Sequence, residues 1–132
     1  MRRVVALAAA LCPAAAHAGD CMDKASTQTD MNACAAAALT AADSKLNSLY
    51  GEIEGRLAGD SGAKKELVAA QRAWLAFRDA ECAFASSGVA GGSVAPMIYS
   101  LCLEDQTQRR ARDFDGYLKC AEGDLSCPVP PK

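Results

Sequence analysis

Six of the seven cysteines in this 132-residue chain follow an N-terminal segment with the features of an export leader, and the single histidine, His17, lies inside that segment. An exported chain reaches an oxidising compartment, where paired cysteines form the disulfides that small domains use for stability. Once the leader is removed, no imidazole remains for nucleophilic catalysis or metal binding. The sequence therefore predicts a disulfide-linked domain that acts by binding, with no metal ion and no cofactor.

The first residues have the three-part pattern of a cleavable signal peptide. Arg2 and Arg3 are basic, and residues 4–11 form an apolar run. Ala16-His17-Ala18 is a small-x-small cleavage pattern. The apolar run is shorter than the ~20 residues of a membrane-spanning helix. We therefore predict a signal peptide over residues 1–18, cleaved after Ala18, and a periplasmic or secreted product; a buried N-terminal helix is the alternative.

A lipid anchor is a second alternative, because two cysteines lie near the predicted cleavage site. Acylation requires a small residue directly before the cysteine and Leu or Val two places further back. Cys12 follows Leu11 and Cys21 follows Asp20, so neither site fits this pattern. We expect a product without a stable membrane span.

The charge balance is mildly acidic. The chain has 16 Asp and Glu residues against 14 Lys and Arg residues, and two of the basic residues lie in the predicted signal peptide. An acidic domain is a poor ligand for nucleic acid, whereas a basic protein is attracted to it. Residues 19–132 suit a single domain, which we expect to be monomeric.

Apolar residues recur at steps of three and four along most of the chain, which is the pattern of amphipathic helices. The first helix is expected to be capped by Thr29 and to end at the turn over residues 59–62. A second helix is expected over residues 63–85, and a third from Val94, with Pro96 in its first turn. Short loops between long helices imply antiparallel neighbours. The sequence thus predicts an all-α fold, a small antiparallel three-helix bundle stapled by disulfides.

Two finer expectations concern the first two helices. The polar segment over residues 21–28 is expected to lead into the first helix as extended chain. One apolar stripe of the second helix is expected to consist of Leu67, Ala70, Trp74 and Phe77.

Six cysteines remain after removal of the signal peptide, and they can pair in many ways. Topology narrows the choice, because Cys82 and Cys102 lie at equal distances on either side of Gly92 and a helical hairpin brings them level. The two tail cysteines can close a small loop, which leaves the first two to join the N-terminal segment to the first helix. A metal site is the alternative, but no histidine and no C-x-x-C pair supports it. The expected pairs are Cys21–Cys34, Cys82–Cys102 and Cys120–Cys127.

Polar residues fall at helical spacing on the inner side of each predicted helix. Folding the first hairpin about its turn places Asp43 opposite Arg78, and folding the second places Arg78 near Thr107. We expect an Asp43–Arg78 ion pair within a network that fixes the register of the helices, because buried polar groups must be paired. A polar functional site between the helices is the alternative. The predicted network is Asp43, Asn47, Tyr50, Gln71, Trp74, Arg78, Thr107 and Arg110.

Several of these residues belong to segments that resemble the LprI-type lysozyme inhibitor domain family. The most specific segment is Gln71–Cys82, and the resemblance spans nearly the whole predicted mature chain. It implies a helical, disulfide-linked domain that inhibits lysozyme. Founding members of this type are lipoproteins, whereas this chain lacks a good lipid-attachment site. The other matching positions are Cys21, residues 27–34, Asp43, Leu46, Asn47, Tyr50, Gly91-Gly92-Ser93, Tyr99, Cys102, Thr107 and Arg110.

The residues of this chain give little support for a catalytic activity. Glycoside hydrolysis needs two facing carboxylates. Asp79 and Glu81 are two residues apart, so they point to different faces of a helix. We therefore predict that the protein is not an enzyme.

The loop between the second and third helices is the predicted partner-binding element. A Cys82–Cys102 disulfide would hold its base, and its glycines allow close backbone approach. A plain helix connection is the alternative, and Arg109, Arg110 and Arg112 form a second candidate surface. We predict that the domain binds and inhibits a lysozyme; the alternative partner is another envelope protein or a toxin. The predicted partner-binding residues are Ser86, Ser87, Gly91, Gly92 and Ser93.

Overall fold

The computed structural model describes residues 18–131, and the predicted signal peptide lies outside the described residues up to position 17. The described part contains α-helices, one short 3₁₀ helix and a folded tail, and no strand occurs in it. The fold is therefore all-α, as the periodicity of the sequence predicts. The helices are α1 (Ala18–Lys24), α2 (Gln28–Arg56), α3 (Ser61–Ala85), η1 (Ser87–Val89) and α4 (Ala95–Leu118).

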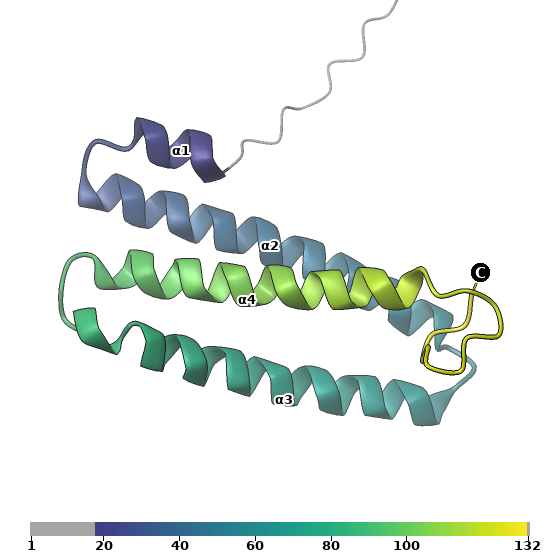
Figure 1. Cartoon of the computed structure of the whole chain (residues 1–132). Helices are drawn as coiled ribbons and strands as arrows, with labels where there is room; N and C mark the ends of the chain where they lie inside the picture. The colour runs from purple at the N-terminus through teal and green to yellow at the C-terminus, as the bar shows by residue number, and fades with distance from the viewer. Residues whose placement is uncertain (1–17, 132) are drawn as a thin grey trace, which may run out of the picture.

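The three long helices run up, down and up, so α3 is antiparallel to both of its neighbours in sequence (Figure 1). The helix α4 lies between α2 and α3, and the principal contact of the bundle joins the parallel pair α2 and α4 (Figure 1). A smaller contact joins α3 to α4, and α2 touches α3 at few points. The helices α2 and α3 therefore each pack against α4 and make little contact with each other.

The hydrophobic core follows from this arrangement. Its largest members are Ile53 on α2 and Phe114 on α4, both fully buried. The tail folds back onto the same end of the bundle, where Val129 is buried and Arg56 Nη1 donates to the carbonyl of Leu118 over 3.0 Å. The buried cluster consists of Leu46, Ile53, Leu57, Ala111, Phe114 and Val129.

The start of α2 differs from the prediction by two residues, because Thr27 and not Thr29 is the N-cap. The Thr27 hydroxyl accepts a hydrogen bond from the Asp30 amide over 3.1 Å, and the Asp30 carboxylate accepts one from the Thr27 amide over 3.0 Å. This reciprocal pair is a capping box, which satisfies two amides that the first turn leaves without helix partners. Hydrogen bonds to the Asp30 carboxylate from the Thr27 side chain and from the backbone amides of Ser26 and Thr27 lower the pKa of Asp30.

The segment before α2 is also different from the expectation of an extended chain, because residues 18–24 form the short helix α1. Asp20 lies in its first turn and Lys24 in its last, an arrangement that suits the helix dipole. The helix lies back along α2 (Figure 1), and the disulfide Cys21–Cys34 joins the two. A helix of this length is too short to show periodicity, so the pattern of the sequence does not reveal it.

Two of the four residues predicted to form the apolar stripe of α3 do not pack against the core. Leu67 and Trp74 pack against the core, as expected. Ala70 and Phe77 are exposed, and the side chain of Phe77 is 56% accessible to solvent. The reason is the position of α4, which covers only a narrow strip of α3 and leaves the rest of the stripe in solvent.

Within residues 18–131, three disulfides join the six cysteines in the pairs that the topology predicts. The Cα–Cα separations are 5.7 Å for Cys21–Cys34, 5.5 Å for Cys82–Cys102 and 6.0 Å for Cys120–Cys127. Because α3 contributes only one fully buried residue, Cys82 itself, the second disulfide is its firmest attachment to α4.

We expect Thr27→Ala to lower the free energy of unfolding by about 1 kcal/mol, because the Asp30 amide loses its acceptor. The matched control is Thr29→Ala, which removes the same side chain two residues later, where no cap exists, and should change stability by less than about 0.5 kcal/mol. Urea unfolding followed by circular dichroism measures both. A larger loss for the Thr29 variant would contradict the assigned cap.

Candidate functional site

The connection between α3 and α4 is a series of tight turns. Consecutive backbone hydrogen bonds join Val89 to Ser86, Ala90 to Ser87 and Gly92 to Val89 over 3.0–3.2 Å. Gly91 has φ 78°, a conformation that favours glycine. At Gly92 a Cβ atom would lie 3.1 Å from the Val89 carbonyl oxygen, so the turn is tight there as well. These bonds hold the loop in one shape.

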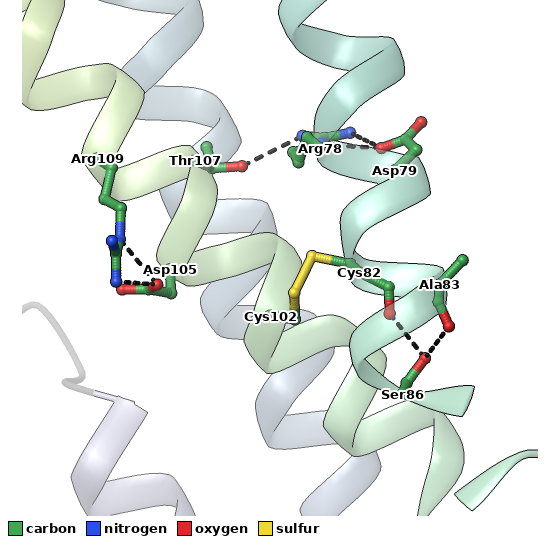
Figure 2. Close-up of a disulfide and its surroundings, with 9 residues drawn as sticks. All are labelled: Arg78, Asp79, Cys82, Ala83, Ser86, Cys102, Asp105, Thr107 and Arg109. Carbon is green, nitrogen blue, oxygen red and sulfur yellow. Dashed lines mark hydrogen bonds and ion pairs between the residues drawn. A yellow bond between two sulfur atoms is a disulfide. The ribbon is translucent and has the colours of Figure 1, made fainter. Parts of the chain in front are cut away.

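Two contacts fix this loop to the rest of the bundle. The disulfide Cys82–Cys102 lies at its base (Figure 2), and Asn32 on α2 donates from Nδ2 to the Ser93 carbonyl over 3.1 Å. The loop therefore projects from the end of the bundle at which α2 begins (Figure 1). Pre-organisation of this kind lowers the entropy lost when a loop binds a partner.

The predicted binding residues fall into two groups. Ser87, Gly91, Gly92 and Ser93 are exposed and available to a partner. Ser86 is half-buried, and its hydroxyl donates to the Cys82 carbonyl over 2.8 Å, so it closes the end of α3 (Figure 2).

The predicted ion pair between α2 and α3 is present. Arg78 Nη1 lies 3.2 Å from Asp43 Oδ1 and 3.2 Å from the hydroxyl of Thr107, which is fully buried on α4. The other edge of the guanidinium donates to Asp79, with Nε to Oδ1 at 2.9 Å (Figure 2). One arginine thus joins all three long helices at a single level.

A second arginine lies one layer along the bundle. Arg110 Nε donates to Gln71 Oε1 over 3.1 Å, and its guanidinium carbon lies 4.5 Å from the ring centre of Phe114. The Trp74 ring lies between the two arginines, at 5.3 Å from Arg78 and 5.9 Å from Arg110. Arginine over an aromatic ring is attractive, and the gain is larger where water is excluded.

Tyr50 completes the aromatic side of this layer. Its ring lies 6.1 Å from that of Phe114. Burial raises the pKa of Tyr50, Glu54 raises it further, and Arg72 opposes the change. The tyrosine therefore stays protonated at neutral pH and acts as a packing residue.

Asn47 is the one predicted member that lies outside the network, since its side chain is exposed. The prediction assumed that α3 covers α2 along its length. Because α4 occupies that position, the residue after the buried Leu46 faces solvent instead. Sequence reasoning also missed Asp79 and Phe114 as arginine partners; the adjacency of Asp79 to Arg78 was the available signal.

This arrangement leaves the polar groups of the layer engaged with one another. The side chain of Arg78 is 13% exposed and that of Asp43 is 42% exposed, so the ion pair is half-buried. Among residues 18–131, no group of three His, Cys, Asp or Glu side chains could hold a metal ion. The geometry thus supports a role in fixing helix register.

The second candidate surface does not form one patch. Arg109 pairs with Asp105 over 2.9 Å on the exposed face of α4 (Figure 2). Arg110 is half-buried with its guanidinium over Trp74, whereas Arg112 is exposed like Arg109. Separately, none of the helices in the described range is long and apolar enough to cross a bilayer.

The fold and its exposed, disulfide-anchored loop define a class of small helical domains held together by cystine bridges. Residues 21–114 match the family described as Lysozyme inhibitor LprI, and the chain belongs to this family. It is also 36% identical over 117 residues to an uncharacterized protein of Rhizobium meliloti (strain 1021), with 78% of this chain and 81% of that protein aligned. No solved structure matches the chain.

We expect Arg78→Met to lower the free energy of unfolding by about 1–2 kcal/mol, because Thr107 and Asp43 lose their shared donor while the methionine keeps most of the stem packing. Arg109→Met is the control, since it removes an exposed ion pair and should change stability by less than about 0.5 kcal/mol. Thermal and urea unfolding measure both. An Arg78 variant that melts with the parental protein would exclude a stabilising network.

Proposed function

We propose that this domain is exported, binds lysozyme and inhibits it without catalysing a reaction. The observation that carries the proposal is the match of residues 21–114 to the Lysozyme inhibitor LprI family. The three disulfides support an oxidising location, periplasmic or secreted, in which such an inhibitor would meet its target.

The loop over residues 86–94 is the part of the domain best suited to enter a lysozyme cleft. Ser87, Gly88 and residues 90–93 are exposed, the loop projects at one end of the bundle, and its turns and the nearby disulfide hold it rigid. Its hydroxyls and backbone amides can hydrogen-bond to the paired carboxylates of a glycosidase. No charged side chain lies in the loop itself to oppose that approach.

The charge of the domain supports the encounter with a basic enzyme. Acidic residues outnumber basic ones over the chain. Asp20, Asp23 and Asp30 are exposed on α1 and on the first turn of α2, at the end from which the loop projects. Complementary charge accelerates association and is weakened by salt.

We expect the purified, oxidised domain to slow the clearing of a bacterial suspension by a c-type lysozyme, in proportion to its concentration. Turbidity measures activity, and calorimetry with the same enzyme measures binding directly. A domain reduced and alkylated beforehand is the control, since it lacks the disulfides that hold the loop. Absence of both inhibition and binding at a large molar excess would favour another envelope protein or a toxin as partner.

Within this proposal, the double variant Ser87→Glu/Ser93→Glu should weaken inhibition by about tenfold or more, because it brings carboxylates toward a cleft that already holds two. The matched control is Ser44→Glu/Ser48→Glu, which adds the same charge at exposed positions of α2. Circular dichroism establishes that both variants fold. Equal inhibition by the two variants would place the contact elsewhere on the domain.

A further inference from the structure

A shallow hollow lies on the first half of α3, toward the end of the bundle that is opposite the loop over residues 86–94 (Figure 1). Its volume is about 400 Å³, which is within the range of sites that hold small molecules. Its lining residues recur at steps of three and four, so they share one side of the helix. The hollow is lined by Ser61, Lys64, Lys65, Val68, Ala69 and Arg72.

Three of the six lining residues are cationic, although the chain as a whole is acidic. Lys64 Nζ lies 3.6 Å from Glu54 Oε1 on α2, so its charge already has a partner. Lys65 and Arg72 are exposed, and within residues 18–131 neither of them forms an ion pair. Two cations of the hollow therefore remain available to an anion.

The nearby carboxylates are engaged elsewhere or point away from the hollow. Asp60 caps the start of α3 with its carboxylate, and Asp79 accepts a hydrogen bond from Arg78. Glu66 lies two residues from Val68, so the helix directs it to another face. None of these three acidic residues lines the hollow, so the positive charge there is not balanced from within.

The surface between the two cations is apolar. Val68 is half-buried and Ala69 is exposed, and both lie between Lys65 and Arg72 along the helix. Arg72 follows them by four and three residues, so its stem leads back over them toward the start of α3. The hollow thus combines two cationic groups with a small apolar surface, which suits a ligand that has both an anionic group and a hydrocarbon part.

We propose that this hollow binds a phosphate ester that carries a short hydrocarbon chain. The Arg72 guanidinium offers paired N–H donors that match two phosphate oxygens, and the Lys65 ammonium adds a compact positive charge. The hydrocarbon part lies on Val68 and Ala69, where it is removed from water. A carboxylate with the same chain has less charge and fewer acceptor oxygens than a phosphate, so it binds more weakly.

This site is separate from the proposed lysozyme contact. The hollow begins at Ser61, whereas the loop follows Ala85 at the other end of α3. At about 1.5 Å per residue, the two ends of this helix are about 36 Å apart. A bound phosphate ester therefore leaves the loop accessible, and each site can be tested without the other.

Titration of the isotope-labelled, oxidised domain with dihexanoyl phosphatidic acid, kept below its micelle concentration, tests the binding. Amide resonances of residues 61–72 should shift, with half-saturation at about 1 mM or below. Inorganic phosphate has no hydrocarbon part, so it should need a concentration higher by about tenfold or more. Hexanoate tests the phosphate group, because it keeps an acyl chain of the same length and should also bind more weakly.

The variant Lys65→Ala/Arg72→Ala should weaken binding of the ester by about tenfold or more, because it removes both unpaired cations of the hollow. The matched control is Lys45→Ala/Arg109→Ala, which removes the same charges at exposed positions of α2 and α4 and should bind the ester like the parental protein. Circular dichroism establishes that both variants fold.

Three outcomes would overturn the proposal. The first is the absence of shifts in residues 61–72 at a large excess of the ester. The second is equal weakening by the two double variants, which indicates attraction by overall charge alone. The third is binding of hexanoate as tight as that of the ester. Vesicles of phosphatidylglycerol distinguish a further source of phosphate: sedimentation of the domain with them, without shifts from the monomeric ester, indicates a membrane surface and also contradicts the hollow as a site.

Discussion

The contact between α2 and α4 holds nearly all of the fully buried apolar side chains, and each other segment is attached to this pair at its edge. Ile53 and Phe114 lie at its centre. The flanking segments α1, α3 and the tail each contain or adjoin a disulfide. A core so rich in alanine buries little apolar area per residue, so cross-links supply what packing alone does not.

The arginine layer performs a related task between α3 and α4. The inward side of α3 has few large apolar residues, and the stems of Arg78 and Arg110 fill the space around Trp74. Long cationic side chains can cover apolar surface while their charged ends reach polar partners. Here the charged ends bind Asp43, Thr107 and Gln71, so the same residues provide packing and helix alignment.

Most of the fold could be predicted from local patterns. Periodicity located the long helices, and the position of Gly92 between Cys82 and Cys102 identified a disulfide that the structure contains. The errors in placing the side chains of α2 and α3 share one physical cause, because the prediction assumed that helices consecutive in sequence touch along their length. The helix α4 lies between α2 and α3, and for this reason Asn47 and Phe77 face solvent while Arg78 still reaches Asp43.

The candidate loop could be located but not described from the sequence. Its glycines and serines marked a connection, whereas the role of Ser86 in closing α3 depends on the backbone path. The bond from Asn32 to Ser93 joins positions far apart in the chain, and no local pattern indicates it.

The attachment of α3 at its two ends determines how this helix can move. A short turn joins one end of this helix to α2, and the Cys82–Cys102 bridge joins the other end to α4. Between these two anchors the helix is held by the arginine and tryptophan contacts and by Leu67, which packs against the core. Local opening would therefore bow the middle of α3 outward while both ends stay in place, and a reducing environment would turn the bowed helix into a flap that is free at one end.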